Sequence, residues 1–127
     1  MLDTLRAEAG FTLLYPCELP AGEALVSAAA AGEGQRRHTT MVFAGPFDLT
    51  LGQALAPPAV SPDPTGASRI YIPLYPDVRA ILIERNDGSQ RAFYQLLWER
   101  DGVYFEIVAD GPPQSRRLIL EIARSLE

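Results

Sequence analysis

The feature that most constrains this fold is a hairpin signal near the C-terminus. Two runs rich in apolar and aromatic residues, 92–98 and 103–109, are separated by Glu99-Arg100-Asp101-Gly102, and Asp-Gly favours a tight hairpin turn. A two-residue turn places Trp98 opposite Phe105, whereas a four-residue loop places it opposite the first residue of the second run. Both registers have the same parity, so the same face of the hairpin is predicted to be core. Its residues are Tyr94, Leu96, Trp98, Val103, Phe105 and Ile107.

A closing amphipathic helix is predicted after this hairpin, beginning near Pro112 or Pro113, because proline is tolerated in a first helical turn. One stripe of apolar side chains recurs at helical spacing. It consists of Leu118, Ile119, Ile122, Ala123 and Leu126. Only three residues separate hairpin and helix, so we expect this stripe to cover the Trp98 face of the chain's own sheet. The alternative is that the helix docks on a partner or a second copy.

The chain before the hairpin is predicted to hold a short helix and six strands. Asp3 or Thr4 can cap the helix, with Leu2 and Leu5 pointing inward and Gly10 ending it. The strands are expected at 11–15, 24–31, 39–43, 47–51, 69–74 and 78–84. The alanines of 24–31 favour a helix, but the stretch is short for one, so we predict a strand.

Two further hairpin registers follow from local patterns. A three-residue loop at Ala44-Gly45-Pro46 pairs Phe43 with Phe47, a match that a two-residue loop would break. A turn centred on Asp87-Gly88 sets Ile81 against Tyr94. The same register places Glu84 opposite Arg91 and Ile83 opposite Ala92, which extends the Trp98 face. The continuous apolar run 80–83 indicates a central strand that is covered on both faces.

Length and composition bound the protein to one ordered domain, residues 1–127. A hydrophobic content of 47% with 21% charged residues argues against disorder. No apolar run approaches the ~20 residues that span a bilayer. The net charge of −5 disfavours nucleic acid as a partner. Residues 54–68, rich in proline, glycine and serine, are predicted to form a loop, functional or mobile.

Few residues carry recognisable chemistry. Cys17 and His38 are the only soft metal ligands, and zinc sites need more. A nucleophilic pair of these two residues is conceivable, but no helix start precedes the cysteine to activate it. We therefore predict no catalytic, cofactor or metal residues. Tyr71 and Tyr75 alternate with apolar residues and are expected to line the second sheet face. With Tyr104, they are the candidates for a binding surface.

Several short stretches resemble a bacterial domain family of unknown function. These stretches are residues 10–16, Leu19-Pro20, 49–53, 97–104 and 122–126. The family occurs as the C-terminal, outward-facing domain of anti-sigma-factor-like and sporulation-related membrane-anchored proteins. The resemblance implies a similar fold and a setting outside the membrane, and it supplies no catalytic residues.

We therefore expect an α+β fold with an antiparallel sheet of about seven strands, a short N-terminal helix, and the closing helix packed on one face. The predicted function is a non-enzymatic binding or sensory module whose partner is a protein or a small apolar ligand. Two alternatives are a small carrier that holds an apolar ligand between sheet and helix, and an enzyme of unrecognised type. We expect a cytoplasmic location if the chain is complete and an extracytoplasmic one if it is part of an anchored protein.

Overall fold

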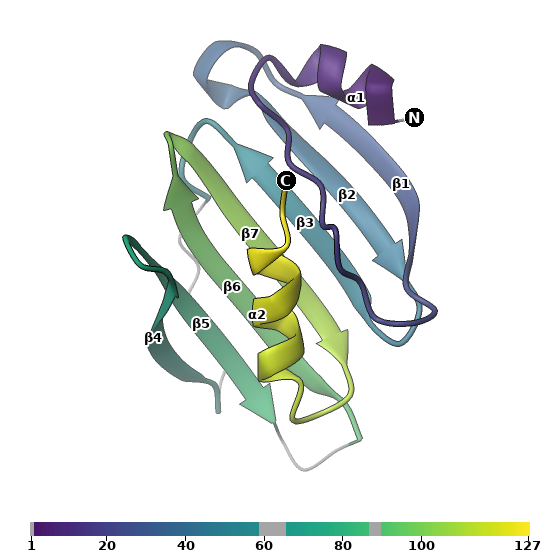
Figure 1. Cartoon of the computed structure of the whole chain (residues 1–127), viewed down its shortest axis with the longest axis vertical. Helices are drawn as coiled ribbons and strands as arrows, with labels where there is room; N and C mark the ends of the chain where they lie inside the picture. The colour runs from purple at the N-terminus through teal and green to yellow at the C-terminus, as the bar shows by residue number, and fades with distance from the viewer. Residues whose placement is uncertain (1, 59–65, 87–89) are drawn as a thin grey trace.

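One antiparallel sheet of seven strands, in the order β1-β2-β3-β7-β6-β5-β4, organises the chain (Figure 1). The computed structural model describes residues 2–58, 66–86 and 90–127. Its elements are α1 (Leu2–Ala9), β1 (Ala24–Ala31), a short 3₁₀ helix η1 (Gly34–Arg36), β2 (His38–Ala44), β3 (Asp48–Ala54), β4 (Ser68–Tyr75), β5 (Val78–Asn86), β6 (Ala92–Arg100), β7 (Val103–Gly111) and α2 (Arg116–Arg124). The expected α+β class, with its sheet and two terminal helices, is confirmed.

Both helices and the segment between α1 and β1 lie on the same face of the sheet (Figure 1). We call this the covered face and the other the open face. Strand β7 shows the difference, because its side chains alternate between buried and half-buried along the strand. Phe105 and Ile107 are buried on the covered face, whereas Tyr104 and Glu106 are half-buried on the open face. The hydrophobic core therefore lies between the covered face, the helices and the N-terminal segment.

The β6–β7 hairpin has a two-residue turn, one of the two loops that the sequence allowed. Trp98 pairs with Phe105, and the ladder ends where Arg100 pairs with Val103. Asp101 and Gly102 between them have φ of 53° and 80°, the positive values that such a turn requires of both residues. The rings of Trp98 and Phe105 stack with centroids 5.1 Å apart and an interplanar angle of 6°. All six residues predicted for the core face of this hairpin are buried.

The helix α2 covers its own sheet, as expected, but begins at Arg116 rather than near Pro112 or Pro113. The two prolines stay in the preceding turn because this turn is bonded to the sheet. The Tyr94 hydroxyl donates to the Pro112 carbonyl, 3.4 Å away, and accepts from the Ser115 N–H at 2.8 Å. Four members of the predicted stripe, Ile119, Ile122, Ala123 and Leu126, are buried, and Leu118 is half-buried.

The predicted β5–β6 register is wrong by three residues. Ile81 pairs with Leu97 and Glu84 with Tyr94. An odd shift exchanges the faces, so Ala80 and Leu82 extend the core, and Ile81 and Ile83 belong to the open face. Glu84 accepts hydrogen bonds from Arg116 of α2 instead of facing Arg91. Strand β5 is also not central, since only β4 separates it from the sheet edge.

The β2–β3 register is also shifted, here by two residues. Phe43 pairs with Leu49 rather than Phe47. An even shift keeps the predicted faces, and the core side chains of both strands are buried as expected. Phe47 lies outside the ladder, where its ring is buried in the core and its N–H donates to Oε1 of Glu23 at 2.9 Å. The Phe47 ring is therefore buried in the core, and the β2–β3 ladder begins two residues later in β3 than predicted.

The N-terminal third holds the remaining corrections. Residues 24–31 form a strand, as predicted, but residues 11–15 do not belong to the sheet. Helix α1 begins at Leu2, before both predicted caps, Asp3 and Thr4, and ends before Gly10, whose φ is 74°. Leu5 is buried as expected. The predicted loop 54–68 falls partly at residues 59–65, which lie outside the described part of the chain.

Candidate functional site: a cleft on the covered face

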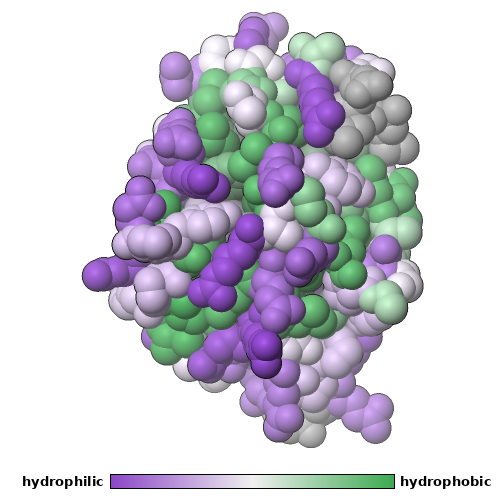
Figure 2. All heavy atoms as spheres, viewed as in Figure 1, coloured by the Kyte–Doolittle hydropathy of each residue, from purple (hydrophilic) through white to green (hydrophobic). Residues whose placement is uncertain are grey.

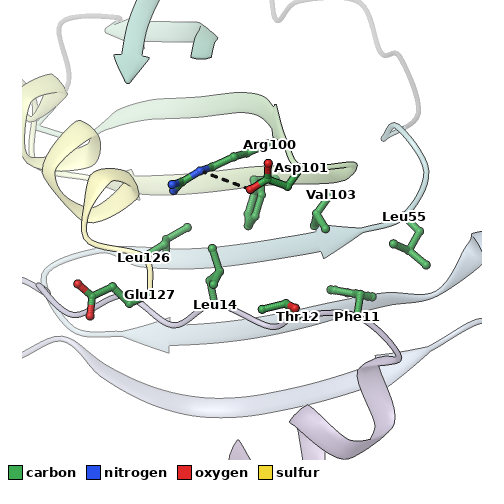
Figure 3. Close-up of a pocket in the computed structure, with 10 residues that line it drawn as sticks. Phe11, Thr12, Leu14, Leu55, Arg100, Asp101, Val103, Leu126 and Glu127 are labelled. Atoms are coloured by element: carbon green, nitrogen blue, oxygen red, sulfur yellow. Dashed lines mark ion pairs between the residues drawn. The ribbon is translucent and has the colours of Figure 1, made fainter. Parts of the chain in front are cut away.

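A cleft of about 520 Å³ opens the covered face between the N-terminal segment and the tip of the β6–β7 hairpin (Figure 3). Its lining residues are Phe11, Thr12, Leu14, Leu55, Arg100, Asp101, Val103, Phe105, Leu126 and Glu127. The molecular surface, seen from the direction of Figure 1, shows hydrophobic side chains between polar ones on this face (Figure 2). The volume falls in the range of about 300–1,000 Å³ that is typical of ligand sites.

One wall of the cleft is the N-terminal segment, residues 11–15, which hydrogen bonds hold above the sheet. The side-chain amide of Gln53 on β3 bonds both backbone groups of Leu14: Oε1 accepts from the N–H at 2.9 Å, and Nε2 donates to the carbonyl at 2.8 Å. Gln53 is almost completely buried. Buried amides need such partners, so this side chain fixes how close the segment comes to the sheet.

The C-terminal residues close one end of the cleft. Tyr15 and Glu127 exchange two backbone hydrogen bonds, at 2.8 and 3.0 Å, and the N–H of Cys17 donates to the Ser125 carbonyl at 3.1 Å. Pro16 and Leu126 form the antiparallel bridge at the centre of this short ladder. The N-terminal segment and the last residues of the chain therefore lie side by side and together build one site (Figure 3).

The cleft combines apolar walls with charged groups at its rim. Phe105 and Val103 of β7 supply buried apolar surface, and Phe11, Leu14 and Leu55 are half-buried. At the hairpin tip, Nε of Arg100 lies 3.9 Å from Oδ2 of Asp101. The guanidinium group of Arg100 also lies 4.5 Å from the centroid of the Tyr75 ring, a favourable cation–π distance. Apolar walls with a few polar groups suit recognition of an apolar group.

Cys17 and His38 have separate partners. The Cys17 thiol lies 3.6 Å from Oε2 of Glu127, whereas Nδ1 of His38 lies 3.0 Å from the Arg36 carbonyl. Desolvation, followed by the hydrogen bond and negative charge of Glu127, raises the pKa of the Cys17 thiol, which favours the unreactive neutral form. In the described residues, no group of three or more His, Cys, Asp or Glu side chains could hold a metal ion.

The three candidate tyrosines lie apart from one another. Tyr71 of β4 is 61% exposed on the open face. A register shift between Pro73 and Tyr75 turns Tyr75 to the other side, where its hydroxyl donates to the Ala123 carbonyl of α2 at 3.2 Å. The expectation that Tyr71 and Tyr75 share the second face is therefore wrong, because this irregularity interrupts the alternation along β4.

Tyr104 lies on the open face next to Glu99 in the β6–β7 ladder. A hydrogen bond to the Glu99 carboxylate raises the pKa of its hydroxyl. Neither Tyr71, Tyr75 nor Tyr104 lines the cleft, and a binding role for them stays a prediction. In the sequence, Gln53 is the residue that indicates the cleft wall, because an amide at a core-facing position of an apolar strand must find a buried partner.

No family model matches the sequence, and comparison with curated proteins and with solved structures likewise finds no match. Among the described residues, no helix is long and apolar enough to cross a membrane. The observations thus define a class of protein by fold and site. This class is an α+β domain with one antiparallel sheet and a cleft between the sheet, the N-terminal segment 11–15 and the C-terminal residues.

Proposed function

We propose that this protein is a non-enzymatic binding module and that the cleft on the covered face is its site, accepting an apolar group of the ligand. The observation that carries the proposal is the cleft itself. It holds about 520 Å³ next to buried Phe105 and Val103, at a place where neither helix covers the sheet (Figure 1). Apolar surface at such a hollow is the usual mark of a binding site.

Binding rather than catalysis is supported by the polar groups at the cleft. Catalysis by a nucleophile needs a base within hydrogen-bond reach. The polar side chains at the rim are Thr12, Arg100, Asp101 and Glu127. His38 bonds a backbone carbonyl elsewhere, so among the described residues neither a cysteine nor a histidine lines the cleft. The resemblance noted in the sequence adds a separate proposal, a setting in the bacterial envelope, which the flanking sequence of the native gene product tests.

The alternative, a carrier that holds an apolar ligand between sheet and helix, has less support. It requires room for an apolar ligand between sheet and helix, but side chains fill that space. Ile119 and Ile122 of α2 are no more than 2% exposed against the sheet, and Tyr94 ties the helix start to β6 through Ser115. The available room lies beside α2, under the N-terminal segment, so an apolar group enters from the rim rather than beneath the helix.

The single tryptophan provides the test. Trp98 stacks on Phe105, which lines the cleft, so an anilinonaphthalene sulfonate dye bound there should quench Trp98 fluorescence by energy transfer. Thr12 is exposed at the rim, and Thr12→Tyr should obstruct the cleft and weaken dye binding by about tenfold, roughly 1.4 kcal/mol.

The matched control is Thr4→Tyr, the same substitution at an exposed position of α1. This variant should bind the dye like the original protein. Equal dye affinity for the Thr12 and Thr4 variants, with both proteins folded, would show that the dye binds elsewhere and would contradict the proposal.

A further inference from the structure

We propose that the ligand of the cleft is an extended peptide that pairs through its backbone with the N-terminal segment at Leu13. The inference deepens the proposed function and rests on it, because it names the ligand class for the same cleft. It requires peptide backbone groups as well as an apolar side chain. A small apolar molecule would satisfy the proposed function without satisfying this inference.

The first observation is the alternating direction of the backbone groups in this segment. Both groups of Leu14 point to Gln53, whereas both groups of the next residue, Tyr15, point to Glu127. The N–H of Cys17, two residues further, again points to the C-terminal residues. Alternation of this kind is the behaviour of a strand, with one edge facing Gln53 and the other facing the end of the described chain.

The second observation is that the next position on that edge lacks a partner. By the same alternation, the N–H and carbonyl of Leu13 face the side on which Tyr15 meets Glu127. Within the described residues, no hydrogen bond reaches either backbone group of Leu13. The side chain of Leu13 is part of the hydrophobic core, and its two neighbours, Thr12 and Leu14, line the cleft. The edge therefore has one unused pairing position.

The third observation is that the cleft lies where the missing strand would run. Glu127 and Leu126 line its near end, and Thr12 and Phe11 line it further along the segment (Figure 3). A chain continuing the ladder made by Tyr15 and Glu127 would pass Leu13 about two residues later, since pairing residues repeat every second position. It would run antiparallel to the segment, as residues 125–127 do.

The lining indicates the side chains that such a peptide carries. Side chains of a strand alternate between two faces, so every second residue can point toward Val103 and Phe105, which are buried and apolar, while the others point to solvent. The rim carries one positive side chain, Arg100, and two negative ones, Asp101 and Glu127, so it disfavours an acidic peptide. The expected ligand is thus an extended segment that alternates apolar and small polar residues, bound by β-augmentation.

Amide hydrogen exchange in the free protein is the first part of the test. The Leu13 amide should exchange much faster than those of Leu14 and Tyr15, which are hydrogen bonded. A pool of acetylated, amidated heptapeptides that alternate Val, Ile, Leu or Phe with Ser or Thr is then added. Binding members should shift the Leu13 amide resonance and slow its exchange, and Thr12→Tyr, unlike Thr4→Tyr, should abolish both effects.

An N-methyl scan of one binding peptide is the second part. Methylation removes a backbone donor, so at alternate peptide positions it should weaken binding by about tenfold, and at the intervening positions it should change little. Loss of affinity without this period of two would overturn the backbone pairing. If no member of the pool moves the Leu13 amide while the dye still binds in a Thr12-dependent way, the inference fails and the proposed function stands. If neither peptide nor dye binds, both fail.

Discussion

Two segments cover the same face of the sheet, and they differ in how much of their attachment comes from apolar burial and how much from hydrogen bonds. Helix α2 is held mainly by buried apolar side chains, among them Ile119 and Ile122. The N-terminal segment beside it also buries Leu13 in the core, but its backbone is positioned by hydrogen bonds, from Gln53 on one edge and from Glu127 on the other. The covered face is closed under α2 and hollowed beside the segment.

The difference follows from the nature of the two interactions. Burial of apolar surface is non-directional, so a helix settles until its side chains fill the available space. A hydrogen bond fixes a distance of about 3 Å between two atoms. The Gln53 amide therefore holds the Leu14 backbone at a set height above β3, whether or not side chains fill the space alongside. The first cover stabilises the fold, and the second also leaves room for a ligand.

The largest expected effect on stability comes from the loss of a buried apolar side chain of α2. Ile122 is 2% exposed beneath α2, and Ile122→Ala should lower the free energy of unfolding by about 2–5 kcal/mol because a cavity replaces packed atoms. Urea denaturation measures the loss. Leu118→Ala, at a half-buried position of the same helix, is the control and should cost clearly less. Equal small losses for both variants would mean that the helix is not packed as described.

Substitution of the amide that holds the segment should have a smaller effect on stability and a larger one on the cleft. Gln53→Leu leaves the N–H and carbonyl of Leu14 without their partners, at a cost of about 1–3 kcal/mol for each group that stays buried, and should release the cleft wall so that water can reach them. Dye binding should therefore be lost, although the protein stays folded. By comparison, Ile122→Ala should retain dye binding while it remains folded.

The control for this substitution is Gln95→Leu. Gln95 is half-buried on the open face, and its amide donates to the Glu106 carboxylate at 2.7 Å. It lies on the opposite face of the sheet from the cleft, so its replacement should leave dye binding unchanged. A Gln53→Leu protein with normal dye affinity would show that hydrogen bonds do not set the cleft, and the contrast between the two covers would disappear.

The two hairpins of the second half show what local sequence determines. Asp101-Gly102 allows the positive φ angles of a two-residue turn, and this chemistry specified the β6–β7 register. The same dipeptide at Asp87-Gly88 suggested an equivalent turn, but there the ladder is offset by three residues. The run 80–83 is apolar at every position, so its pattern is compatible with either face, and packing of the whole sheet decides between them.

The cleft was harder to foresee because its walls come from distant parts of the chain. Residues 11–15 have the composition of a strand, yet the partners of this segment are a side-chain amide 39 positions away and the C-terminal residues. Local periodicity carries no information about such contacts. The covering of the sheet by α2, in contrast, followed from one apolar stripe and a short connection, both of which are local in sequence.

The smallest expected effect is at the junction of the two covers, where Cys17 lies next to Glu127. The pKa of this exposed thiol is raised, chiefly by desolvation and then by the Glu127 carboxylate, with a further contribution from the charge of Glu18. A raised pKa means fewer thiolates at a given pH, so alkylation by iodoacetamide at pH 8 should be slower in the folded protein than in urea. Glu127→Gln removes a hydrogen-bonded negative charge, which should lower the pKa of the thiol and speed alkylation severalfold, whereas Glu18→Gln should have a weaker effect. Equal alkylation rates for Glu127→Gln and the original protein would show that the Glu127 carboxylate does not lie against the Cys17 thiol.

The raised pKa also links stability to pH. The folded state retains the thiol proton to higher pH than the unfolded state, so the free energy of unfolding should fall slightly as the pH rises past the ordinary thiol pKa of 9.0.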